Sequence, residues 1–255
     1  MTIQAADASL FQMQTSSDLL NWQVVGNFEG GGTPTTLNLL NSASSSSLTV
    51  DGNAADYVLA EGSPVTAVQG FNTLRVGSLV PDGGRNAVLV FELPVIAAPL
   101  QIEQAELEMN VNRTFAKWDA DLWAIGIKDN TKPILEYSET PTGNPEVVKL
   151  EDAIFDFTTS NSGEVVKSNP LSGLTQYLQT FYSANSDYAG GKYLFLRVNP
   201  TNDIGVNEQR YTISSAESSD ASERPKRNFY LKDPSANPDK QFYRVRYGTN
   251  GVTGP

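Results

Sequence analysis

The chain has 255 residues with no cysteine and no histidine, and its 29 acidic against 18 basic residues give a formal net charge of −11. Without cysteine there is no disulfide framework, thiolate metal site or thiol nucleophile, and without histidine the commonest general base and transition-metal ligand are missing. The negative charge argues against nucleic-acid binding, because phosphates are neutralised by a basic face. No apolar run approaches about 18 residues, so we predict no membrane insertion.

The N-terminal region reads as a small β-unit. Phe11 and Met13 alternate with glutamines before a polar turn, and a second apolar segment follows, which is typical of strand, turn, strand. Trp22 follows the turn, and we expect it to anchor the core of this unit. A serine-rich segment at 42–47 indicates a linker and a domain boundary. Residues 1–14 do not resemble a signal peptide, so we expect that a signal was removed or that the protein is made without one.

Short strands separated by turns follow the linker. In 105–111 every second residue is apolar, and in 120–127 Trp123 and Ile125 lie on one expected face. Alternation of this kind is typical of a strand with one buried face and one solvent-facing face. The strands predicted in this region are 48–50, 56–60, 73–77, 86–93, 102–111, 120–127 and 133–137.

The second half of the chain is less regular. Residues 138–170 are polar with scattered glycine and proline, and we predict a long excursion with one strand near 146–150. An apolar stripe that starts at Leu174 with helical spacing predicts one helix over 171–185. Many short strands and one helix predict an all-β fold, a two-layer antiparallel β-sandwich of the jelly-roll kind. The further strands predicted are 193–198, 210–214, 229–231 and 241–247.

Five segments between residues 48 and 232 follow one another in an informative order. They are Asp56-Tyr57-Val58, NTLRVG at 72–77, RNAVLVFELP at 85–94, the strand at 101–111 and YTISSAESSDASERP at 211–225. In this order they resemble DNRLRE-type carbohydrate-binding modules, which are jelly-roll sandwiches of secreted bacterial polysaccharide lyases and surface proteins. A long insert around 138–190 departs from that pattern. The resemblance implies a jelly-roll domain over 48–232 that binds polysaccharide.

The two ends of the chain resemble the halves of another module. FQMQTSSDLLNWQVVG at 11–26 is similar to the first half of a short β-module of Verrucomicrobia-like surface proteins, and Asp233-Pro234 with FYRVR at 242–246 is similar to its second half. We expect that the sandwich is inserted into this module and that strands of 1–41 and 233–255 pair, because loops tolerate inserted domains. The alternative is an N-terminal arm and a C-terminal strand that never meet.

One polar loop contains candidates for a sugar site. Trp118 lies in RTFAKWDAD together with Arg113, Lys117 and Asp119. A flat indole ring can cover the apolar face of a pyranose, and the neighbouring charges could hold an acidic sugar. The other interpretation is a plain surface turn. Trp123 is expected in the core, because it is in register with apolar residues.

Arginines on the predicted strands are a second set of candidates. Arg75, Arg85 and Arg197 lie on or beside strands, and a guanidinium fork matches the carboxylate of a uronate sugar. The competing interpretation is ordinary cross-strand pairing, or an arginine that lies over the sheet edge. A structural calcium ion is a third candidate, since Asp51, Asp56 and Glu61 could supply oxygen ligands near the first strand of the sandwich. The spaced aspartates of a calcium loop are missing, and a plain turn explains Asp51 equally well.

Residues for catalysis are scarce. Glu106 and Glu108 read as the solvated face of a strand, and no pair of carboxylates has an apolar setting that would separate their pKa values. The sequence contains neither a nucleophile elbow nor a phosphate loop. We therefore expect no enzymatic activity, and no cofactor other than a structural calcium ion.

Two functions are compatible with these observations. The first, implied by the resemblance, is a non-enzymatic module at the cell surface or outside the cell that adheres to polysaccharide or a cell-surface glycan, with weak sites reinforced by many copies. The second is a structural subunit of an assembly, such as a virion decoration protein or a surface filament, that displays the sandwich outward. In that case the terminal strands, 243–247 included, would contact further copies of the chain, a capsid or a filament partner.

Overall fold

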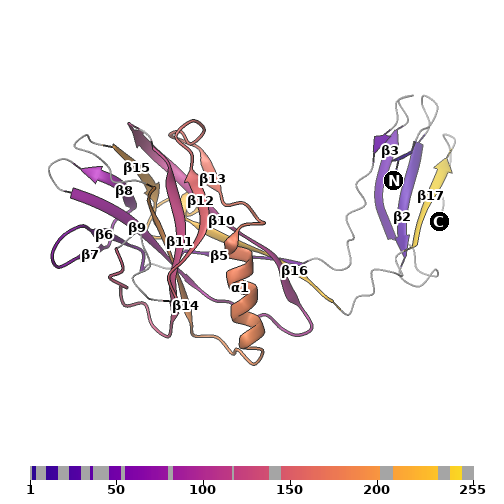
Figure 1. The fold of residues 1–255 in the computed structure, drawn as a ribbon. Helices are drawn as coiled ribbons and strands as arrows, with labels where there is room; N and C mark the ends of the chain where they lie inside the picture. Colours follow the sequence, from indigo (N-terminus) through magenta and orange to yellow (C-terminus); the bar gives the residue numbers. More distant parts are fainter. Residues whose placement is uncertain are drawn as a thin grey trace. The chain divides into compact units, whose positions relative to one another are not determined.

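The structure is a computed structural model that describes residues 2–3, 10–16, 23–29, 35–36, 46–52, 55–79, 83–116, 118–137, 145–201, 209–234 and 242–248. The chain divides into two compact units, one of residues 46–231 and one formed by 1–45 together with 232–255. Antiparallel strands make up most of the described chain, which confirms the predicted all-β class (Figure 1).

The larger unit contains twelve described strands and one described α-helix, α1 (Gly173–Ala184), with a short 3-10 helix at Ala221–Glu223. The predicted strand at 133–137 does not form. Strands at 66–69 and 165–167, and the part of a strand at 151–155, were not predicted. The strands are β5 (Ser46–Asp51), β6 (Tyr57–Ala60), β7 (Thr66–Gln69), β8 (Thr73–Leu79), β9 (Gly83–Glu92), β10 (Gln101–Phe115), β11 (Ala120–Lys128), β12 (Val148–Phe155), β13 (Val165–Lys167), β14 (Tyr193–Pro200), β15 (Gln209–Ser214) and β16 (Lys226–Lys232).

A hydrogen-bonded path links nine of these strands in the order β12-β11-β14-β9-β8-β15-β10-β16-β5, and β6, β7 and β13 attach beside it. Strand β10 changes partners along its length. It pairs with β13 up to Asn110 and with β15 from Val111 onward. The register shifts between Val111 and Arg113, and a β-bulge of this kind bends a strand. The sheet curls, so strands from its two halves face each other across one core. The jelly-roll connectivity stays a prediction.

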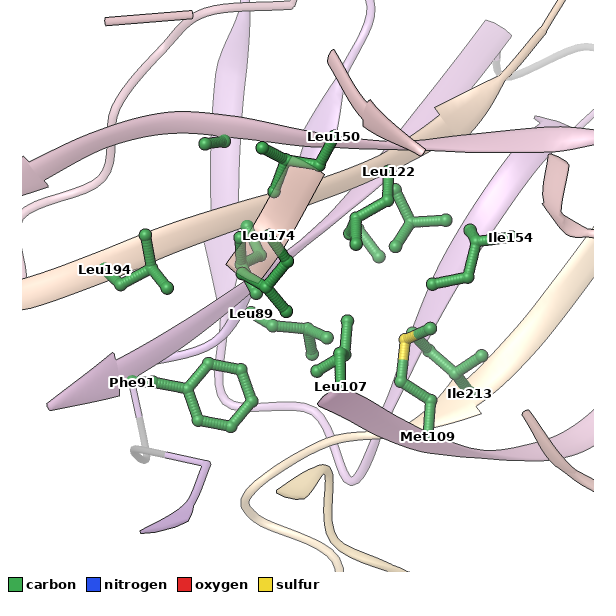
Figure 2. Close-up of a cluster of buried hydrophobic side chains, with 14 of the residues drawn as sticks. Leu89, Phe91, Leu107, Met109, Leu122, Leu150, Ile154, Leu174, Leu194 and Ile213 are labelled. Carbon is green, nitrogen blue, oxygen red and sulfur yellow. The ribbon is translucent and has the colours of Figure 1, made fainter. Parts of the chain in front are cut away.

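The main core fills the inside of this curl. Figure 2 shows Leu89, Leu107, Leu122, Leu150 and Leu174 converging from β9, β10, β11, β12 and α1. The alternation predicted for 105–111 is confirmed, since every second side chain of that segment is buried in this cluster. Burying one large apolar side chain contributes about 1.5–3 kcal/mol, so the cluster is a principal source of the stability of the unit.

A second core covers the opposite face of β9, β11 and β14. Trp123 packs there with Tyr57 and Phe195, as expected for a core tryptophan, beneath the irregular segment 131–137. The Tyr57 hydroxyl accepts a hydrogen bond from the Ile134 N–H at 2.8 Å and donates one to the Ile134 carbonyl at 3.0 Å. Strand β11 is therefore buried on both faces, and the prediction of a solvent-facing side was wrong for it. Segment 131–137 does not form a strand, because its backbone groups form hydrogen bonds with side chains such as those of Tyr57 and Asn86.

Helix α1 forms as the apolar stripe predicts. The Ser172 hydroxyl caps its start by accepting from the Leu174 N–H, and Leu174 and Leu178 are buried. Gly173 allows the close approach of the helix to β12, because a Cβ at this position would lie 2.8 Å from the Leu150 carbonyl oxygen. The helix thus packs against β10 and β12 (Figure 1).

The smaller unit contains strands from both ends of the chain. β2 (Leu10–Ser16) lies between β3 (Gln23–Glu29) and β17 (Phe242–Gly248) in a three-stranded antiparallel sheet, and β1 (Thr2–Ile3) pairs with β4 (Thr35–Thr36). The N- and C-terminal strands therefore pair, with β17 at the edge of their sheet. Trp22 lies outside the described residues.

Candidate functional site

The loop that precedes β11 does not present an open aromatic platform. The Trp118 ring is half-buried and packs against Tyr211 with a centroid separation of 5.0 Å, and it lies so close to Gly77 that a Cβ there would collide with the indole. The Tyr211 hydroxyl also donates to the Trp118 carbonyl at 2.8 Å. Since this packing covers the ring, the geometry does not favour the sugar-platform role predicted for Trp118. Lys117 lies outside the described residues.

Three other predicted ligand groups are engaged within the protein. An Asp119 carboxylate oxygen accepts a hydrogen bond from the Phe157 N–H at 3.0 Å, which fixes the chain that follows β12. The half-buried Arg85 donates to the Gly84 carbonyl at 2.9 Å. Arg197 is fully buried beside Trp123 and donates to Asn199, so the structure contradicts an exposed uronate-binding role for it.

The three carboxylates proposed for calcium do not converge. Asp56 is fully buried, and its two oxygens accept from the Val90 N–H at 2.7 Å and the Ala216 N–H at 2.9 Å. An exposed Glu61 accepts from the Gly84 N–H, while Asp51 lies exposed on the edge strand β5. Within the described ranges, no group of three or more acidic side chains is placed to hold a metal ion. The calcium prediction therefore has no geometric support, because the three carboxylates are not gathered and those of Asp56 and Glu61 serve backbone N–H groups.

Burial has a clear electrostatic consequence at Asp56. Removing this carboxyl from water raises its pKa to about 8, and the two backbone hydrogen bonds, which favour the charged form, offset only part of that rise. The carboxyl links β9 to the chain after β15. We assign it a structural role.

The acidic pair on β10 was also interpreted wrongly as a solvated face. Strand β13 pairs with β10 beside it, and the Lys167 ammonium contacts Glu106 at 3.1 Å and Glu108 at 3.0 Å. Glu106 is buried as a result. These carboxylates neutralise a lysine at the junction of two strands, which is a structural arrangement.

Two of the predicted arginines are brought together on one outer face of the sheet. Strand β15 lies between β8 and β10, and Thr212 stands opposite Arg75 on one side and opposite Arg113 on the other. Directly opposed residues of antiparallel strands project to the same face, and strands lie about 4.8 Å apart, so the two arginine backbones are about 10 Å apart. Leu74 and Ile213, the next residues along, are buried, so both arginines point outward and are exposed.

The next row of side chains on this face adds an aromatic ring. Phe115 follows Arg113 by two residues and is 44% exposed, and it stands opposite Arg210 of β15. We call Arg75, Arg113, Phe115, Arg210 and Thr212 the arginine face.

Two cations of the arginine face have no partner among the described residues. Arg75 and Arg113 form no ion pair or hydrogen bond with any residue that the structure describes. By contrast, Lys128, Lys149 and Lys192 all contact carboxylates. Two uncompensated guanidinium groups in a chain with a net charge of −11 are suited to pair with the anionic groups of a ligand.

Sequence patterns could have indicated part of this face. Alternation along β10 places Arg113 and Phe115 on the same side, because they are two residues apart. The neighbourhood of Arg75 and Arg113 depends on the intervening β15, and strand order and register are long-range properties. The polar loop around Trp118 combines an aromatic ring with charged neighbours, as a sugar site would, but the ring is used for packing.

Comparison with known proteins adds no relative. No protein-family model matches the chain, and no curated protein is similar to it at a significant level. Among the residues that the structure describes, no helix combines the length and the apolar character of a membrane span. The geometry of the arginine face is therefore the basis for assigning a function.

Proposed function

We propose that the protein is a non-enzymatic binding module for acidic polysaccharide, located at the cell surface or outside the cell, and that the ligand docks on the arginine face. The observation that carries the proposal is the placement of Arg75 and Arg113 in register across Thr212, exposed and unpaired among the described residues. Guanidinium forks match carboxylate groups, and the exposed Phe115 ring can cover the apolar side of a sugar.

Arg75 and Arg113 are exposed to solvent, so each contact contributes little. An exposed ion pair is worth up to about 1 kcal/mol and is screened by salt. A single module should therefore bind weakly, and binding to a long polymer or by several modules together would raise the avidity. This agrees with adhesion, which needs many weak contacts.

The proposal is tested by calorimetry with polygalacturonate at low salt. Arg75→Gln and Arg113→Gln should each weaken binding by roughly twofold to fivefold, which corresponds to about 0.4–1 kcal/mol. Lys132→Gln is the matched control, since it removes one exposed cation from a different part of the unit. Raising the salt concentration should weaken the wild type more than the double variant. Equal affinity of wild type and double variant would refute the assignment of the face.

A second candidate function is a structural subunit of an assembly, such as a virion decoration protein or a surface filament. The observation that favours it is the position of β17 at the edge of the sheet that also contains β2 and β3. An edge strand has unpaired backbone groups that can add a strand from another chain. Light scattering over a range of concentrations tests this function, because a strand-exchanging subunit would form oligomers whereas an isolated binding module would stay monomeric.

A further inference from the structure

A groove of about 670 Å³ lies between helix α1 and the sheet at β12, and no residue of the arginine face lines it. Tyr177 and Phe181 of the helix form one wall, and Ile127 and Val148 line the opposite side from β11 and β12. This volume is within the range of about 300–1,000 Å³ that is typical of small-ligand sites.

The groove offers one apolar surface and several hydrogen-bonding groups. The Phe181 ring is half-buried, and edge contacts with Tyr182 at 5.2 Å and Tyr188 at 5.4 Å hold it in place. Gln176 and Tyr177 also line the groove, and the side chain of neither forms a hydrogen bond with a described residue. A pyranose ring has this same combination, since apolar C–H faces alternate with a rim of hydroxyl groups.

The charges that line the groove are already neutralised by neighbours. Its charged side chains pair as follows: Lys149 with Asp121 at 2.7 Å and Asp152 at 2.9 Å, Lys192 with Asp129 at 2.6 Å, and Glu146 with Lys128. A carboxylate ligand would have to displace a protein carboxylate from one of these lysines. Burial and the nearby Glu146 raise the pKa of Tyr177 to about 12, so its hydroxyl remains a neutral donor. Hydrogen bonds to neutral hydroxyl groups require no such displacement.

We infer that this groove is a second carbohydrate site, selective for neutral pyranose units. This inference rests on the proposed function only because it assumes that the protein binds carbohydrate. The groove would bind neutral sugars, whereas the arginine face would bind acidic ones. Gln176 and Tyr177 donate hydrogen bonds to sugar hydroxyls, and Phe181 covers a ring face. One module would then hold a neutral segment in the groove and an anionic segment on the sheet.

The experiment is calorimetry with cellohexaose, laminarihexaose and mannohexaose as neutral probes and hexagalacturonate as the acidic probe. We expect at least one neutral hexasaccharide to bind at millimolar concentration or below. Tyr177→Phe and Gln176→Ala should each weaken that binding threefold to tenfold, because each removes one hydrogen bond. Ser183→Ala is the matched control, since Ser183 is an exposed helix residue outside the groove lining. Unchanged unfolding midpoints would show that the variants fold.

Three results would overturn the inference: no neutral probe binds, the groove variants bind a neutral probe as the wild type does, or hexagalacturonate loses affinity in Tyr177→Phe. The double variant of Arg75 and Arg113 should leave neutral binding unchanged while polygalacturonate binding falls. The two sites can therefore fail independently, and each failure has a different signature.

Discussion

The buried Asp56 carboxyl makes a strong prediction about how stability depends on pH. Its pKa is raised from 3.8 in the unfolded chain to about 8 in the fold, because burial penalises the charged form. Between about pH 4 and pH 8 the native state therefore binds a proton that the unfolded state has released. Stability must fall as pH rises through this window, by about 1.4 kcal/mol per pH unit at most.

The composition of the chain makes this effect easy to isolate. With no histidine or cysteine, few side chains other than Asp56 titrate between pH 6 and pH 8. We expect the free energy of unfolding to fall by about 2 kcal/mol over that interval, since the dependence flattens near the folded pKa. Urea unfolding measures this free energy, and tryptophan fluorescence reports it for the larger structural unit, which contains both Asp56 and the buried Trp123.

Two variants separate Asp56 from general charge effects. In Asp56→Asn the dependence on pH should disappear, and the protein should lose about 1–3 kcal/mol at pH 6 because the amide nitrogen would face a backbone N–H. Asp187→Asn, at an exposed position, should keep the wild-type slope. A flat wild-type profile, or the same slope in Asp56→Asn, would show that the carboxyl is ionised in the fold and that the reasoning is wrong.

Three further changes test the packing that supports the two sites. Tyr57→Phe should cost about 1–2 kcal/mol in urea unfolding, because it removes both hydrogen bonds to Ile134, and a neutral result would mean that segment 131–137 is not held there. Gly77→Ala should cost about 3 kcal/mol or more, since its φ of +125° and the adjacent Trp118 ring leave no room for a Cβ; wild-type stability would contradict this. Gly173→Ala should cost about 1–3 kcal/mol and weaken neutral-sugar binding by moving helix α1 from β12; intact binding would separate the groove from this contact.

The sequence was most informative where the pattern is local. Alternation over 105–111 predicted which apolar residues of β10 face the core, and helical spacing from Leu174 predicted α1 within two residues at its start. Both depend on the short-range geometry of one element against one core. The all-β class followed from the number of such segments.

What the sequence could not show depends on pieces that are distant in the chain. Strand β11 is buried on both faces because segment 131–137 returns across it, and Glu106 is buried because β13 pairs with β10. Strand β12 was predicted only near 146–150, within a polar stretch, whereas it extends to Phe155. Long-range coverage of this kind converts an apparently solvent-facing residue into a buried one.

The candidate site illustrates the same limit. Arg75 and Arg113 were recognised as candidates from their residue type, but their common face emerges only from the register of β8, β15 and β10. Trp118 was a candidate because its flat ring lies in a polar, charged loop, and the absence of a side chain at Gly77 is what lets the ring pack inward.

The most direct test of the account is a map of chemical-shift changes in the isotope-labelled protein as hexagalacturonate is added. We predict that the largest changes cluster on the arginine face, at Arg75, Thr212, Arg113 and Phe115. These changes should vanish in the double variant with both arginines replaced by glutamine. Changes that cluster elsewhere, or that persist unaltered in the double variant, would contradict the assignment of the arginine face as the binding site.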